Sequence, residues 1–330
     1  MALDINLRKH LLRAWQDVNL LSVLLLPLSA VYWCLLNIHK SLYSLGIKNS
    51  NKASLPVIVV GNLSVGGTGK TPLVIHVVEL LKRHGFKPGV VSRGYNSTAE
   101  QGSFILEASM PAALVGDEPS LIARRTSVPV AVGSSRHQSI ELLTDLCDVI
   151  VCDDGLQHWP LKADLRLCID DVTATSNPFL LPAGPWREVK SRMASMDMIV
   201  ARNSDSDHDG QFFMQLEAKE PLNLLSAKPG LDIEQTIHAV AGIAQPSRFF
   251  DTCKTLGLSI VEHAFADHHQ FVESDLNFDQ RAVLMTEKDA VKCLPFAKAH
   301  HWYLPVTAKL SENFDANLLN KLDKAITQRS

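Results

Sequence analysis

Short, continuous apolar runs alternate with helical patterns along the chain from Val57 onward. The runs are rich in Val and Ile and lack alternating polar positions, which is typical of strands buried on both faces. Helical patterns lie between them, notably over Lys70–His84 and Ser135–Leu146. The expected strands are Val57–Val60, Gly89–Ser92, Val128–Val132, Val149–Asp153, Leu165–Asp170 and Met198–Ala201. The pattern predicts a mostly parallel sheet covered by helices on both sides.

A second alternating region follows a softer, more polar stretch, Asn203–Leu231, which includes the run DSDHDG. Its expected strands are Ile237–Ala241, Ser259–His263, Ala282–Thr286 and Trp302–Val306. The pattern therefore predicts an α/β protein with a smaller C-terminal α/β lobe. The expected domains are an N-terminal helical segment over 1–54, a core over 55–231 and the lobe over 232–330.

The N-terminal region contains an uncharged apolar segment, Asn19–Ile38, with the sequence NLLSVLLLPLSAVYWCLLNI. About 20 helical residues match the thickness of a bilayer, so membrane contact is the favoured interpretation. Pro27 interrupts the segment, and basic residues flank it on both sides. These features leave open whether the segment spans the membrane or lies in its surface. The alternative is a buried core helix.

Composition narrows the functional classes. The chain has 330 residues and a formal net charge of −3, which gives no sign of a nucleic-acid partner. Its six cysteines form no C-x-x-C pair, so we expect reduced thiols in or near the core and no zinc site. No feature of the sequence indicates an obligate protein partner.

The most informative segment is Val57–Thr71, VIVVGNLSVGGTGKT, in which an apolar strand breaks into glycines and ends in Gly-Lys-Thr. Glycines let backbone N–H groups turn toward phosphate oxygens, the lysine can reach the β- and γ-phosphates, and the threonine hydroxyl can bind Mg²⁺. The sequence therefore predicts a P-loop that binds ATP or GTP. The general motif would have glycine where this chain has Ser64. The expected nucleotide-binding residues are Ser64, Val65, Gly66, Gly67, Thr68, Gly69, Lys70 and Thr71.

Two adjacent carboxylates, Asp153 and Asp154, follow the predicted strand over 149–153. Such a pair after an apolar strand is costly unless it is neutralised by a partner or a metal, and a P-loop enzyme needs carboxylates near its Mg²⁺. Gln157 could reach the same metal shell. The alternative is a solvated Asp-Gly turn.

Four further polar positions are candidates for chemistry. Asp117 could take a proton from an acceptor hydroxyl or could simply cap a helix. His268 could tune a carboxylate or satisfy a local backbone group. Arg187, before Glu188, could neutralise a transferring phosphate or mark an ordinary loop junction. Arg93 follows a strand, at the sheet edge where open α/β folds bind ligands.

Taken together, these segments resemble the tetraacyldisaccharide 4′-kinase family, the lipid A 4′-kinases of Gram-negative bacteria. Eight motifs carry the resemblance in order along nearly the whole chain, and the family's own N-x-S-V-G-G form accounts for Ser64. The motifs are VGNLSVGGTGKTP, VSRGY, GDEP, VCDDGLQH, LPAGPWRE, AGIAQPSRFF, FADHHQF and MTEKDAVK.

The resemblance implies ATP- and Mg²⁺-dependent transfer of the γ-phosphate to the 4′-hydroxyl of an acylated glucosamine disaccharide 1-phosphate, giving lipid IVA. It also implies a P-loop kinase core and contact with inner-membrane lipid at the cytoplasmic face. Asp117 becomes the expected base, paired with His268, and Arg187 joins Lys70 at the catalytic surface. The expected metal neighbourhood comprises Thr71, Asp153, Asp154, Gln157 and Glu188.

A rival interpretation is a nucleotide-switch protein, such as a partitioning ATPase or a metal-insertion GTPase. Those proteins often have a second lysine just before the paired glycines, where this chain has Val65. A G-protein would also need N-K-x-D, whereas this chain has Thr286-Glu287-Lys288-Asp289. A membrane-anchored structural protein with a vestigial P-loop would not explain the acidic and Arg-Glu motifs.

Overall fold

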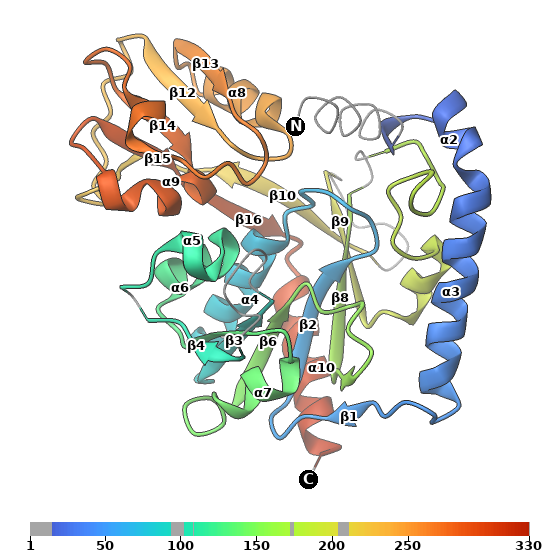
Figure 1. Ribbon diagram of the computed structural model, residues 1–330. Coiled ribbons are helices and arrows are strands. Elements are labelled where there is room, and N and C mark those ends of the chain that lie inside the picture. Colours follow the sequence, from blue (N-terminus) through green and yellow to red (C-terminus); the bar gives the residue numbers. More distant parts are fainter. Residues whose placement is uncertain (1–14, 94–101, 108, 172–174, 204–210, 330) are drawn as a thin grey trace. The chain divides into compact units, whose positions relative to one another are not determined.

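The computed structural model describes residues 15–93, 102–107, 109–171, 175–203 and 211–329 (Figure 1). Part of the VSRGY motif, the run DSDHDG and the basic residues before Trp15 lie outside these ranges. The chain forms two compact units, each built from separate segments. The first unit comprises 1–70, 149–215 and 310–330, and the second comprises 71–148 and 216–309. The expected division into residues 1–54, 55–231 and 232–330 stays a prediction.

The first unit contains a parallel sheet with the strand order β10-β9-β8-β2-β6. Every residue of β2 and β6 is buried, because both strands consist almost entirely of apolar side chains. Helix α10 packs against β8, and its side chains Phe314, Leu318 and Leu322 are fully buried. The sheet strands are β2 (Val57–Asn62), β6 (Val149–Asp153), β8 (Leu165–Asp171), β9 (Met198–Arg202) and β10 (Phe212–Ala218). The other elements are β1 (Asn51–Lys52), β7 (Leu161–Lys162), η2 (Lys190–Ser195) and α10 (Phe314–Thr327).

The apolar N-terminal segment forms two consecutive helices, α2 (Leu20–Leu24) and α3 (Leu26–Ser44). Pro27 lies in the first turn of α3, where its missing N–H costs no hydrogen bond. The buried residues of these helices are Ser22 and Ser29, whereas leucines such as Leu20, at 75% exposure, face outward. The alternative of a buried core helix is therefore wrong. Among the described residues, none of the helices has the length and apolar character needed to cross a membrane.

The polar side of α3 docks onto the loop over 177–187. The Ser29 hydroxyl donates to the Leu180 carbonyl at 2.9 Å and accepts from the Ala183 N–H at 3.0 Å. The Tyr32 hydroxyl donates to the Arg187 carbonyl at 2.8 Å. Ser29 is thus buried against the loop while apolar residues of α3 such as Leu28 and Leu35 are exposed, which reverses the usual arrangement of a surface helix.

The second unit contains a five-stranded sheet, β11-β15-β14-β12-β13, in which only β11 is antiparallel to its neighbour. It also contains β3, β5 and β4, of which β4 is antiparallel to β5. The strands are β3 (Pro88–Ser92), β4 (Phe104–Ile105), β5 (Val130–Val132), β11 (Leu222–Asn223), β12 (Ile237–Ala241), β13 (Ile260–Ala264), β14 (Val283–Thr286), β15 (His301–Leu304) and β16 (Val306–Leu310). The helices are α4 (Lys70–Arg83), α5 (Ala112–Val115), α6 (Asp117–Thr126), α7 (Arg136–Glu141), α8 (Pro246–Thr255), η3 (Glu273–Leu276), α9 (Glu287–Cys293) and η4 (Leu294–Phe296).

The prediction of mostly parallel sheets with flanking helices is confirmed, and three details differ. The expected strand Trp302–Val306 is divided at Pro305, which cannot donate a ladder hydrogen bond. The expected helix Ser135–Leu146 ends at Glu141, after which tighter bonds such as Thr144 N–H to the Glu141 carbonyl replace the α-helical ones. Strand β10 lies within the stretch that we interpreted as a polar connection.

Candidate functional site

The predicted P-loop joins β2 to α4, which begins at Lys70. Gly66 and Gly69 have φ angles of 133° and 85°, which L side chains rarely adopt. A Cβ at Gly69 would also come within 3.2 Å of the Met214 methyl group. Thr68 is 2% exposed, and its hydroxyl has no hydrogen-bond partner in the described part of the protein. The loop therefore has the glycine geometry, and a spare hydroxyl, for binding an anionic ligand.

Lys70 lies between an amide and a carboxylate. Its Nζ is 3.1 Å from Asn62 Oδ1 and 3.8 Å from Asp154 Oδ1. Asp154 is also paired with Arg187, whose Nη1 lies 3.1 Å from Asp154 Oδ2. The structure thus brings two predicted cationic groups to one predicted carboxylate. A nucleotide phosphate can exploit both cations, because Lys supplies a point charge and Arg a planar fork of donors.

The segment that carries Arg187 packs directly on the P-loop. The Val65 N–H donates to the Pro185 carbonyl at 2.8 Å, and the Arg187 N–H donates to the Leu63 carbonyl at 2.7 Å. These backbone bonds fix the LPAGPWRE motif beside the glycine loop. They explain why a loop distant in sequence takes part in the phosphate site.

Gln157 and Glu188 continue this network away from Lys70. The Gln157 amide donates to the Asn62 carbonyl at 3.0 Å and to Glu188 Oε1 at 3.3 Å. Glu188 is fully buried and forms ion pairs with Lys40 and Arg192. Its charge is therefore already balanced by two cations. The assignment of Glu188 and Gln157 to a metal shell stays a prediction.

Asp153 ends β6 and is 1% exposed, and Asp154 follows with a φ of 49°. Within the described residues, no three His, Cys, Asp or Glu side chains are grouped so that they could hold a metal ion. Mg²⁺ needs fewer protein ligands than that, because it usually keeps several waters and takes one or two carboxylates together with substrate phosphates. The two aspartates at the end of β6 can supply such carboxylates, and the place of the Thr71 hydroxyl at the metal stays a prediction.

A second cluster lies in the second unit, where His268 Nδ1 is 3.1 Å from Asp117 Oδ2. Asp117 is the first residue of α6 and is 5% exposed. Burial alone would raise the pKa of Asp117. The hydrogen bond to His268 and the charges of Lys292 and Lys288 outweigh burial and hold the pKa below its ordinary value. The carboxylate is therefore charged at neutral pH, as a proton acceptor must be.

The structure distinguishes the two adjacent histidines. His268, which has a φ of 60°, contacts Asp117, whereas His269 Nε2 lies 2.9 Å from Asp275 Oδ2. The contact between Asp117 and His268 thus exists, and the catalytic role of the pair stays a prediction. Arg93 is exposed at the end of β3.

Sequence reasoning missed three residues that support these clusters. Asn62 contacts Lys70, and Arg202 Nη1 donates to the Gly67 carbonyl at 2.7 Å. Both residues end parallel strands of the first unit, and that position was the signal available in the sequence. Lys292, 2% exposed, lies 3.8 Å from Asp117 Oδ2 and 2.6 Å from Asp289 Oδ1. Lys292 ends the motif MTEKDAVK, but no chemical role was assigned to it, although it is a polar residue in the largely buried helix α9.

A buried parallel strand, a glycine loop and a Lys-Thr pair at the start of a helix place the protein in the class of P-loop proteins that bind nucleoside triphosphates. The family model described as tetraacyldisaccharide-1-P 4′-kinase matches residues 21–323. The chain therefore belongs to the tetraacyldisaccharide-1-P 4′-kinase family, as the motifs predicted.

Relatives and a solved structure agree with this assignment. The chain is 43% identical to the tetraacyldisaccharide 4′-kinase of Shewanella frigidimarina, over 94% of this chain and 95% of the relative. It is 44% identical to that of Shewanella sp. strain ANA-3, over 94% of each. The crystal structure of the Aquifex aeolicus kinase in complex with ATP matches with a TM-score of 0.79 and 28% identity, covering 92% of this chain and all of that one.

Proposed function

We propose that this protein transfers the γ-phosphate of ATP to the 4′-hydroxyl of a tetraacylated glucosamine disaccharide 1-phosphate, forming lipid IVA. Membership of the family supports this reaction, and the two polar clusters supply its chemical requirements. The observation that carries the proposal is the convergence of Lys70, Asp154 and Arg187 at the P-loop. A kinase needs this arrangement because the transferred phosphoryl group spreads negative charge over its oxygens.

ATP is the proposed phosphate donor. The Aquifex aeolicus relative is in complex with ATP, and the glycines of the loop here have the φ angles that bring N–H groups toward phosphates. Lys70 would bind the β- and γ-phosphates, and Arg187 would balance charge that develops during transfer. Asp154 keeps both cations in place before the nucleotide binds.

Mg²⁺ would be held by Asp153, Asp154 and the Thr71 hydroxyl, with Gln157 and Glu188 in the surrounding shell. The ion supplies charge neutralisation at the phosphates when it is bound. Asp154 already balances Lys70 and Arg187. We therefore assign the main metal contact to Asp153.

Asp117 is the proposed proton acceptor for the 4′-hydroxyl. His268 donates to one carboxylate oxygen, which orients the group and leaves the other oxygen for the hydroxyl. Lys292 and Lys288 keep Asp117 ionised. A carboxylate with a low pKa is a weak base, so the proton moves late, as the bond to phosphorus forms.

The acylated acceptor places the reaction at the membrane, and the proposed location is the cytoplasmic face of the inner membrane. Helices α2 and α3 support it, because Leu24, Leu28 and Leu35 are 67%, 57% and 60% exposed. A continuous exposed apolar face is unfavourable in water and indicates a membrane or protein contact. The hydrogen bonds of Ser29 and Tyr32 to the loop over 177–187 keep these leucines facing away from the protein.

The test is transfer of labelled phosphate. The purified protein, incubated with γ-labelled ATP, Mg²⁺ and the disaccharide 1-phosphate in detergent micelles, should give a labelled lipid that chromatography separates from ATP. An acceptor that lacks the 4′-hydroxyl is the control and should stay unlabelled. Release of labelled phosphate at an equal rate with and without acceptor would instead indicate a nucleotide switch.

A further inference from the structure

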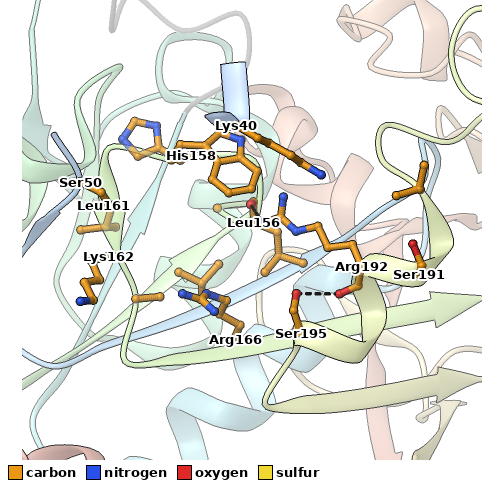
Figure 2. Close-up of a pocket in the computed structure, with 15 residues that line it drawn as sticks. Lys40, Ser50, Leu156, His158, Leu161, Lys162, Arg166, Ser191, Arg192 and Ser195 are labelled. Carbon is orange, nitrogen blue, oxygen red and sulfur yellow. Dashed lines mark hydrogen bonds between the residues drawn. The ribbon is translucent and has the colours of Figure 1, made fainter. Parts of the chain in front are cut away.

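The first unit contains a cationic pocket of about 410 Å³ beside the end of α3 (Figure 2). Four Lys and Arg side chains line it, contributed by α3, by β7, by the start of β8 and by the 3₁₀ helix η2. They are Lys40, Lys162, Arg166 and Arg192. Among the described residues, no Asp or Glu lines it. A concave surface with this charge attracts an anion, because the low-dielectric walls strengthen the field.

Two of the four cations, Lys40 and Arg192, are held in place by a buried carboxylate. Buried Glu188 lies 3.0 Å from Lys40 Nζ and also pairs with Arg192. Arg192 Nη2 donates to the Leu156 carbonyl at 2.9 Å, and its guanidinium lies 4.1 Å from the centre of the Trp159 ring. One carboxylate and one aromatic face thus fix the two cations without neutralising both.

The other two cations remain available to a ligand. Over the described parts of the chain, no carboxylate is paired with the side chain of Lys162 or Arg166. The Arg166 backbone, and not its guanidinium, bonds to Asp197. Unpaired Arg and Lys at the same pocket are the groups that recognise phosphate oxygens. Ser191 and Ser195 add hydroxyl groups at the wall.

The position of the pocket indicates the source of the phosphate. Lys40 lies two residues after Ile38, which is 58% exposed on the apolar face of α3. Tyr43 packs against Trp159 with ring centres 6.4 Å apart. Apolar side chains followed by Lys, Trp and Tyr mark the level of lipid headgroups at a membrane surface. A phosphate bound among these residues would belong to a lipid whose chains lie along α3.

We propose that this pocket binds the phosphate of an anionic membrane lipid, separately from the P-loop. The choice of a lipid rests on the proposed contact of α3 with the membrane. Phosphate recognition itself rests only on the pocket. The site would fix the depth and rotation of the first unit at the bilayer, because a bound headgroup holds α3 beside it.

The experiment measures binding of a short-chain phosphatidic acid, below its critical micelle concentration, by calorimetry. The P-loop is first filled with a non-hydrolysable ATP analogue and Mg²⁺, so that it cannot take the phosphate. The double variant Lys162→Ala/Arg166→Ala removes both cations that have no carboxylate partner, so it should bind the lipid at least about tenfold more weakly. The matched control Lys321→Ala/Lys324→Ala removes the same charge from α10 and should bind as the wild type does.

Three results would overturn the proposal. Equal affinity of the pocket variant and the wild type would place the lipid elsewhere. Equal affinity for short-chain diacylglycerol, which lacks the phosphate, would exclude phosphate recognition. Inorganic phosphate binding as tightly as the lipid would identify a soluble anion as the ligand. Because the probe is soluble and no phosphate is transferred, the outcome is independent of kinase activity and of membrane attachment.

Discussion

At the scale of single residues, Lys70 is the strongest test of the phosphate site. Lys70→Ala should lower kcat at least roughly hundredfold, since it removes the charge that faces the transferred phosphoryl group. Thermal unfolding should stay near the wild-type midpoint because Asp154 keeps its pair with Arg187. Lys82→Ala, on the exposed side of α4, is the control and should keep full activity. Normal turnover of Lys70→Ala at saturating ATP would contradict the assignment.

Asp117 and His268 are expected to act as one unit. The two side chains are 3.1 Å apart. If Asp117 accepts the hydroxyl proton as proposed, loss of either residue should disturb the same proton transfer. The double variant Asp117→Ala/His268→Ala should therefore lose little more turnover than the worse single variant. Steady-state kinetics of all three variants measures this, with ATP affinity as the control. If the two single losses multiply in the double variant, the residues act independently.

Asp153 should show its role through magnesium. Asp153→Asn removes a charge from the proposed metal site, so its loss of turnover should be partly restored by raising the Mg²⁺ concentration. Asp154→Asn should respond less, because its main loss is the pairing with Lys70 and Arg187. Titrations of rate against Mg²⁺ compare the two variants. A wild-type Mg²⁺ dependence of Asp153→Asn would refute the metal assignment.

Residue identity predicted part of the site. Lys70 was evident because a P-loop is local in sequence, whereas the pairing of Asp117 with His268 was implied only by the family resemblance. The surroundings of Glu188 were not predictable, because Lys40 comes from a distant helix and meets the carboxylate only in the fold. The contact of Lys292 with Asp117 was missed for the same reason. The role of a buried lysine depends on its partners in the fold, and these are distant in sequence.

At the scale of elements, α2 and α3 should determine membrane binding. Leu24→Glu/Leu35→Glu places charges on the exposed apolar face and should release the protein from liposomes in a flotation assay. Leu225→Glu, at a leucine that is 60% exposed in the second unit, is the control. Both proteins should bind ATP normally. If the double variant still floats with the lipid, another element makes the contact.

The elements themselves were largely predictable, because continuous apolar strands and a 3.6-residue helical period are local signals. Strand β6 and strand β12 have the predicted bounds. Two expected elements have other bounds in the structure, for local reasons that the pattern of apolar residues does not show. Pro305 divides one expected strand, and the end of α7 at Glu141 depends on hydrogen-bond geometry. The uncharged apolar run favoured membrane contact for α3, but it did not exclude a buried helix, since a core helix and a membrane helix have similar compositions.

At the scale of the whole molecule, His301 should make stability depend on pH. His301 is 1% exposed and its pKa falls to about 4, mainly because burial disfavours the charged ring. The Lys298 N–H donates to its Nδ1, so a proton there would break that bond. As pH falls below about 6.5, the unfolded state gains this proton and the folded state does not. Stability is therefore lost between about pH 6.5 and 4, by at most about 3 kcal/mol.

Urea unfolding of His301→Asn at several pH values tests this. Asparagine can still accept from Lys298 but does not titrate, so the variant should lose less stability than the wild type between neutral pH and pH 5. Parallel stability curves for the wild type and His301→Asn would contradict the linkage.

The docking of α3 through Ser29 and Tyr32 limits how this protein can be engineered. The hydroxyl groups bond to the backbone of the loop that carries Arg187, so the N-terminal helix is part of the scaffold of the phosphate site. A water-soluble version should therefore not be made by cutting the helix away. Substituting only the exposed leucines of α3 by glutamine or lysine would leave the contacts of Ser29 and Tyr32 in place. Among related natural sequences, the exposed positions of α3 should accordingly accept any apolar residue. The positions of Ser29 and Tyr32 should keep a hydroxyl group.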